Sequence, residues 1–115
     1  MNFDQYQTEV KRTSKPDREQ RERLLNDALG LAGEAGEVAD YLKKVLFHGH
    51  EMNPEEVIKE CGDVLWYVTD MLDSLGYTLL YAAEKNKEKL RKRYPDGFSE
   101  ERSRNRGDDD QVTRT

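Results

Sequence analysis

The 115-residue sequence predicts an all-α protein. Apolar residues recur at steps of three and four along most of the chain, and this spacing places them on one face of a helix. No alternation of apolar and polar residues continues long enough to indicate a sheet, and only three prolines interrupt the helical pattern. A chain of this length fits one domain better than two.

The first two helices are expected over residues 2–12 and 18–47. In the first, Phe3, Tyr6 and Val10 follow helical spacing, and the proline-containing segment 13–17 ends it. The second helix is long and ends at the His-Gly-His segment 48–50. Its apolar or small stripe is Leu24, Ala28, Leu31, Ala35, Val38, Leu42 and Val45.

The third helix is expected to begin at Asn53, which can cap it. Pro54 suits the first helical position, and Glu56 sits where a capping box places its acid. Gly76 is the stop signal. The core stripe of this helix is Val57, Cys61, Val64, Val68, Met71 and Leu75.

A fourth helix is expected over residues 78–94, and the Pro-Asp-Gly turn after it places Phe98 to pack back on the body. Residues 99–115 contain one aliphatic side chain and no aromatic one. We therefore expect a helical domain over residues 1–98 and a disordered, charged tail over 99–115.

These helices predict a four-helix bundle-like protomer with two long central helices and two shorter flanking ones. Leu, Ile, Val and Phe together make up only 23 of the 115 residues. Such a core is thin, close to the composition of disordered chains. The fold is therefore expected to complete its core by self-association.

Composition also excludes several classes of protein. A net charge of −5 argues against a general nucleic-acid binder. No apolar segment approaches the roughly 18 residues that would cross a membrane, and none resembles a signal peptide. A single cysteine, Cys61, excludes an internal disulfide and a multi-cysteine zinc site. We expect a cytoplasmic protein.

Four acids at helical spacing are the candidate metal ligands. Glu34 and Glu37 are three residues apart on the second expected helix, and Glu60 and Asp63 are three apart on the third. Each pair shares a helix face beside the apolar stripe, so antiparallel packing would bring four carboxylates together. Their repulsion calls for a hard cation, with Mg²⁺ expected and Mn²⁺ as a substitute. Alternatively, the acids form solvated helix faces.

Three glycines, Gly30, Gly33 and Gly36, recur inside the second expected helix. Each interior glycine costs roughly 1 kcal/mol relative to alanine. The close approach of another helix or of a ligand would account for them. The alternative is a break in the helix.

At these residues the sequence resembles the MazG-type all-α nucleoside triphosphate pyrophosphohydrolases. The matching stretches are residues 3–13, 24–44, 59–68 and 86–99, and the family's Glu-x-x-Glu and Glu-x-x-Asp motifs fall on the two acidic pairs. The resemblance implies Mg²⁺-dependent hydrolysis of a nucleoside triphosphate to a monophosphate and pyrophosphate. It also implies a homodimer or homotetramer, with Glu34, Glu37, Glu60 and Asp63 as metal ligands.

The implied mechanism is water attack at the α-phosphorus, with Glu37 orienting or deprotonating the water. In the fourth expected helix, Asn86, Lys89 and Arg93 share one face and are candidate substrate-binding residues. A solvated basic helix end is the alternative for them. Tyr94 can contact phosphate or pack.

The expected role is the cleansing of nucleotide pools. Two alternatives stay open: a pyrimidine-specific dUTP or dCTP pyrophosphatase, and a non-catalytic helical dimerisation or regulatory module. Trp66 and Tyr67, which follow the second acidic pair, can stack on a base or simply pack.

Overall fold

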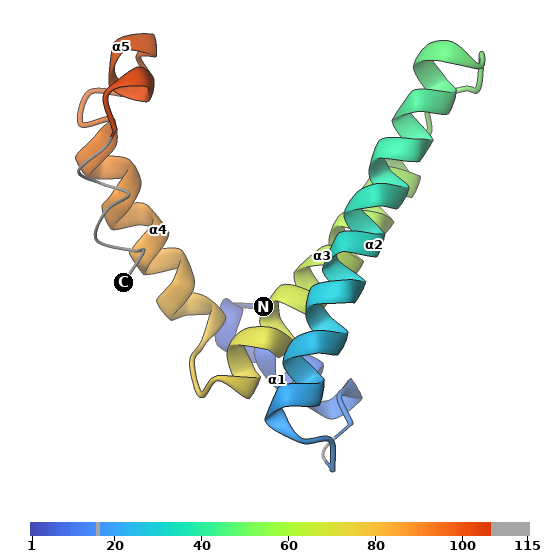
Figure 1. Ribbon diagram of the computed structural model, residues 1–115, viewed down its shortest axis with the longest axis vertical. Coiled ribbons are helices and arrows are strands. Elements are labelled where there is room, and N and C mark those ends of the chain that lie inside the picture. The colour runs from blue at the N-terminus through green and yellow to red at the C-terminus, as the bar shows by residue number, and fades with distance from the viewer. Residues whose placement is uncertain (16, 107–115) are drawn as a thin grey trace. The chain divides into compact units, whose positions relative to one another are not determined.

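The computed structural model describes residues 1–15 and 17–106, and it confirms the all-α prediction (Figure 1). No strand occurs among these described residues. They form five helices: α1 (Phe3–Thr13), α2 (Gln20–Phe47), α3 (Pro54–Ser74), α4 (Leu79–Arg93) and α5 (Glu100–Arg104). The bounds of α1 to α4 lie within about two residues of the expected ones, which is the usual uncertainty of helix ends.

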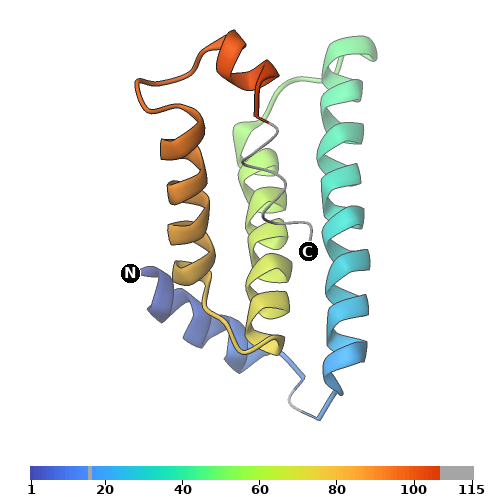
Figure 2. The same ribbon diagram turned by 60° about the vertical axis from the view of Figure 1, so that its left-hand side comes forward.

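The chain divides into two compact units, Met1–Leu79 and Leu80–Thr115. In the first unit, α2 and α3 lie side by side and run antiparallel (Figure 2), and α1 packs against α3. The pair α2 and α3 corresponds to the two long central helices that the sequence predicts. No helix in the described part of the chain is long and apolar enough to cross a membrane.

Local capping explains where α1 and α3 begin. At α1, the Asn2 side chain accepts a hydrogen bond from Gln5 N, and the Gln5 side chain accepts one from Asn2 N, both at 2.8 Å. At α3, the Asn53 side chain accepts a hydrogen bond from Glu55 N at 3.1 Å, and Pro54 occupies the first turn. These caps satisfy backbone donors that a helix start leaves open.

The glycines of α2 do not break the helix. A Cβ atom at Gly30 would collide with the ring of Tyr67 on α3, so this glycine permits the close approach of the two helices. A Cβ at Gly33 or Gly36 would meet nothing within 4 Å. The expected close approach is therefore found at one of the three positions.

A polar network holds the first unit together. Arg23 Nη2 donates to Asp70 Oδ1 at 2.7 Å and to Asp73 Oδ2 at 3.1 Å, which ties α2 to α3. Gln7 of α1 donates to Asp73 Oδ1 at 3.2 Å and accepts from Leu79 N at 2.8 Å. These bonds connect all three helices of the unit.

Few apolar side chains are buried. Among the described residues, only Val10 and Leu79 form the buried hydrophobic core, while Leu25 and Leu29 of α2 and Ile58 of α3 are exposed. The expectation of a thin core thus agrees with the structure. Completion of the core by a second copy of the chain stays a prediction.

The second unit contains most of α4, a turn and α5. The turn is closed by a hydrogen bond from Gly97 N to Tyr94 O at 3.2 Å, and Gly97 has a φ of +94°. Phe98 is 75% exposed and contacts the ring of Tyr94, with 5.5 Å between the centroids.

The helix α5 departs from the expectation of a disordered tail over residues 99–115. The Ser99 side chain accepts a hydrogen bond from Arg102 N at 3.0 Å and so caps this helix. Residues 107–115, the rest of the expected tail, lie outside the described residues.

Candidate metal centre

Three of the four predicted metal ligands gather between α2 and α3. One carboxylate oxygen from each of Glu34, Glu37 and Glu60 lies within 4.8 Å of the others. Glu34 and Glu37 share a face because they are three residues apart on α2, and the antiparallel neighbour α3 brings Glu60 opposite them. We call these three residues the carboxylate cluster.

The acids of the carboxylate cluster lie close enough to affect the protonation of Glu60. The hydrogen-bonding contact with Glu34 raises the pKa of Glu60, and desolvation and the charges of Glu34 and Asp63 raise it further. One buried oxygen of Glu34 and one of Glu60, Oε2 in each case, accept no hydrogen bond from the described residues. A hard divalent cation prefers such oxygen ligands and would satisfy both atoms, so the residues present fit Mg²⁺.

The fourth predicted ligand, Asp63, lies outside the carboxylate cluster. Its side chain is exposed, but its charge acts on Glu60 and it lines a hollow together with Glu34. We call this the aromatic hollow; its volume is about 390 Å³ and it is lined by Thr13, Glu34, Asp63, Trp66 and Tyr67. Asp63 is therefore close to the carboxylate cluster without being part of it.

The aromatic side chains of this hollow are fixed by packing. Trp66 Nε1 donates a hydrogen bond to Thr13 Oγ1 at 2.8 Å, which links α3 to the end of α1. The rings of Trp66 and Tyr67 meet edge to face, with 5.3 Å between their centroids. Both side chains are half-buried.

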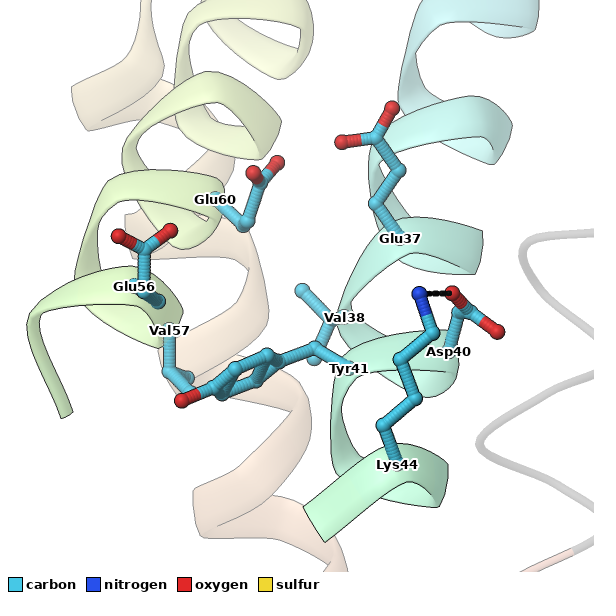
Figure 3. A pocket seen from close by; sticks show the side chains of 8 residues that line it. All are labelled: Glu37, Val38, Asp40, Tyr41, Lys44, Glu56, Val57 and Glu60. Atoms are coloured by element: carbon cyan, nitrogen blue, oxygen red, sulfur yellow. Dashed lines mark ion pairs between the residues drawn. The ribbon is translucent and has the colours of Figure 1, made fainter. Parts of the chain in front are cut away.

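A second hollow, of about 360 Å³, opens beside the carboxylate cluster (Figure 3). We call it the lysine hollow; its lining is Glu37, Val38, Asp40, Tyr41, Lys44, Glu56, Val57 and Glu60. The ring of Tyr41 lies across the space between the helices, and its hydroxyl accepts a hydrogen bond from Asn53 N at 2.7 Å. That bond connects α2 to the start of α3.

The two hollows each contain two of the predicted ligands. Glu37 and Glu60 line the lysine hollow, whereas Glu34 and Asp63 line the aromatic hollow. A cation held by the carboxylate cluster would therefore have space on either side for a ligand. Both volumes fall in the range that small-molecule sites occupy.

The predicted substrate-binding residues lie in the second unit: Asn86, Lys89 and Arg93 on α4, and Tyr94 directly after its end. Asn86 and Tyr94 line one shallow hollow of about 370 Å³ at this helix and its end. Lys89 and Arg93 do not line it; Lys89 is half-buried, and Arg93 is buried with its guanidinium 5.9 Å from the centre of the Tyr94 ring.

Two residues of the first unit are not placed as the sequence predicts, or were not singled out from it. Cys61, which the stripe places in the core, is exposed. Asp27 is completely buried near Asp70, a feature that was not anticipated. Burial and the contact with Asp70 raise the pKa of Asp27 to about 7. The available signal was its spacing, because Asp27 follows Arg23 by four residues.

Comparisons with known proteins extend this picture. A family model, described as the MazG nucleotide pyrophosphohydrolase domain, matches residues 23–98, which include all four motif acids. The chain is also similar to the Gene 37 protein of Mycobacterium phage L5, at 36% identity over 69 residues. The alignment covers 56% of this chain and 60% of the phage protein. No solved structure matches the chain significantly.

Proposed function

The chain belongs to the MazG nucleotide pyrophosphohydrolase domain family, and from that premise we propose that it hydrolyses a nucleoside or deoxynucleoside triphosphate to the monophosphate and pyrophosphate. The observation that carries the proposal is the carboxylate cluster between α2 and α3, with its two buried oxygens that accept no hydrogen bond from the described residues. A phosphate anion cannot approach these acids unless a cation neutralises them.

Glu34, Glu37 and Glu60 are proposed to hold Mg²⁺, with Mn²⁺ as a substitute and Asp63 as a further ligand. The closeness of Asp63 to Glu34 and its influence on Glu60 support its inclusion. When bound, Mg²⁺ neutralises phosphate charge and lowers the pKa of a coordinated water.

Glu37 is the proposed general base. Its side chain is exposed and lines the lysine hollow, so its carboxylate can accept a hydrogen bond from a water in that hollow. Glu37 accepts a proton from that water while the water oxygen forms a bond to the α-phosphorus. The bond from the α-phosphorus to the bridging oxygen breaks, and pyrophosphate leaves in line with the attack.

Our candidates for binding substrate phosphate stay Asn86, Lys89 and Arg93 of α4 and Tyr94 directly after it, on the basis of the family's motif and the chemistry of cationic and amide side chains. We further propose a homodimer or homotetramer, supported by the exposed apolar side chains of α2 and α3. The proposed setting is nucleotide-pool cleansing in the cytoplasm. A preference for dUTP or dCTP is the narrower alternative.

The test is pyrophosphate release from a panel of canonical and modified ribo- and deoxyribonucleoside triphosphates, with Mg²⁺ and with a chelator. We expect Mg²⁺-dependent release by the wild type and a loss of about 100-fold or more in Glu37→Gln, as for other general bases. Glu22→Gln, which removes an exposed acid from the first turn of α2, is the matched control.

Two outcomes would contradict the proposal. Release of single phosphate would exclude attack at the α-phosphorus. No turnover, together with no rise in melting temperature when Mg²⁺ and a triphosphate are added, would instead favour a helical dimerisation or regulatory module with solvated acids.

A further inference from the structure

We propose that Lys44 binds the leaving pyrophosphate portion of the triphosphate in the lysine hollow, exchanging its ion pair with Asp40 for the phosphate oxygens. The inference rests on the proposed function and assigns a phosphate-binding residue within the first unit, next to the carboxylate cluster. It also fixes which of the two hollows receives the terminal phosphates.

The position of Lys44 follows from the geometry of α2. Lys44 comes seven residues after Glu37, which is two helical turns, so both side chains project from the same face. Both line the lysine hollow, together with Glu60 from α3 (Figure 3). An anion in this hollow would therefore lie between the proposed metal ligands and the ammonium group.

The charge balance of the hollow makes Lys44 distinctive. Among the described residues that line it, Lys44 is the only positively charged one, against four acids. A pyrophosphate group there would be repelled by the acids unless a metal ion and a second cation opposed them. Lysine provides such a cation as a point charge on a flexible stem, which is the form it takes in many phosphate sites.

The present partner of Lys44 is easily exchanged. Its Nζ lies 3.1 Å from Asp40 Oδ2, and the two side chains are 46% and 50% exposed. Exposed ion pairs of this kind contribute little to stability. Lys43 Nζ lies 3.3 Å from the other oxygen, Asp40 Oδ1, so Asp40 keeps a cationic partner when Lys44 turns toward the hollow.

The two ion pairs of Asp40 also affect its pKa. The hydrogen bond with Lys44, followed by that with Lys43, holds this pKa below its usual value. Asp40 thus stays ionised near neutral pH and can hold Lys44 beside the hollow before substrate arrives. A competing explanation is that Lys44 only stabilises the carbonyl end of α2, since it lies in the last turn of that helix.

The neighbouring Lys43 gives a matched control. Lys43→Met and Lys44→Met remove the same charge and break an ion pair with the same aspartate, but Lys43 does not line the hollow. Full-length variants are compared by calorimetric titration with inorganic pyrophosphate in the presence of Mg²⁺, and by steady-state kinetics on the best triphosphate from the panel. Melting temperatures check that each variant folds, and Lys44→Arg tests whether charge alone restores binding.

We expect Lys44→Met to weaken pyrophosphate binding and raise the KM for triphosphate by about tenfold, as the loss of one charged contact does. Inhibition by the corresponding monophosphate should not change, because the monophosphate lacks the group that Lys44 contacts. Lys43→Met should stay within about twofold of the wild type, and Lys44→Arg should recover most of the binding.

Equal effects of Lys44→Met and Lys43→Met would overturn the inference, as would an equal loss for monophosphate and pyrophosphate. If the wild type hydrolyses triphosphate while the two variants match, only the role of Lys44 fails. If the wild type neither binds pyrophosphate with Mg²⁺ nor releases it from any triphosphate, the proposed function fails, and the role of Lys44 fails with it.

Discussion

At the scale of single residues, two groups of neighbouring acids differ in how their negative charges are compensated. In the carboxylate cluster, Glu34 and Glu60 face each other with oxygens that accept no hydrogen bond from the described residues. At the other group, Arg23 compensates Asp70 and Asp73 with hydrogen bonds of 2.7 and 3.1 Å. Within the described part of the chain, Arg23 pairs with the second group, whereas the buried Oε2 atoms of Glu34 and Glu60 have no hydrogen-bond partner, and this difference distinguishes a candidate metal site from a structural ion pair.

Asp27 is the residue with the clearest pH signature. Burial, then its contact with Asp70, raises its pKa from 3.8 to about 7. The folded state therefore retains a proton that the unfolded chain has already released, and stability falls as the pH rises from the unfolded value through the folded one. Between pH 6 and pH 8 this residue alone should cost roughly 1.4 kcal/mol of stability.

Asp27→Asn should remove this pH dependence, because the amide can donate to Asp70 as the protonated acid does. The pKa of Asp70 is raised by burial but lowered further by bonds with Arg23, Asp27 and Ser14, so its titration falls well below this window. Denaturant unfolding at pH 6 and pH 8 in chelator gives the comparison. An equal loss of stability in wild type and variant would contradict the role of Asp27.

The sequence predicted that acids of the second and third helices gather, but not how all four of them are arranged. Spacing of three identified both acidic pairs, because residues three apart share a helix face whatever else surrounds them. It could not show that Asp63 lies outside the gathered carboxylates, since that depends on how α2 and α3 rotate against each other. The same rotation leaves Cys61 exposed although it falls on the apolar stripe.

At the scale of elements, the four main helices were predictable because their caps and breakers are local. Asn53 and Pro54 specify the start of α3, and Gly76, with a φ of +79°, follows its end. The helix α5 was missed because its five residues carry no core stripe; only the cap at Ser99 signals it. By contrast, the individual contacts between helices, such as that of Gly30 with the ring of Tyr67, were visible only in the structure.

Gly30 gives a test of the contact between α2 and α3. Alanine normally stabilises a helix interior by about 1 kcal/mol relative to glycine, and Gly33→Ala, whose Cβ meets nothing, should gain up to that amount. Gly30→Ala should instead destabilise the fold, because its Cβ collides with the ring of Tyr67.

Melting temperatures of the two variants provide the comparison, and Gly30→Ala combined with Tyr67→Ala supplies the control. The double variant should lose less stability than the sum of the two single changes, since the collision is absent once the ring is removed. A gain in stability for Gly30→Ala alone would show that the two helices do not approach as described.

At the scale of the whole molecule, the thin core supports the expectation of self-association. Leu25 and Leu29 are four residues apart on α2 and are 62% and 65% exposed, so they form an apolar stripe on one helix face. We predict that light scattering of the purified protein gives the mass of a dimer or a tetramer.

Leu25→Glu combined with Leu29→Glu should shift that mass toward the monomer, because charges cannot be buried unpaired in an interface. Thr8→Glu, which adds a negative charge at an exposed position on a different helix, α1, should leave the mass unchanged. A wild-type protein that stays a stable monomer at high concentration would contradict the prediction.

The central claim is water attack at the α-phosphorus, and isotope labelling tests it most directly. Hydrolysis in water enriched in ¹⁸O, followed by mass spectrometry of both products, shows where the new oxygen goes. The account predicts one ¹⁸O atom in the nucleoside monophosphate and none in the pyrophosphate. Label in pyrophosphate, or in free phosphate released beside a nucleoside diphosphate, would contradict it.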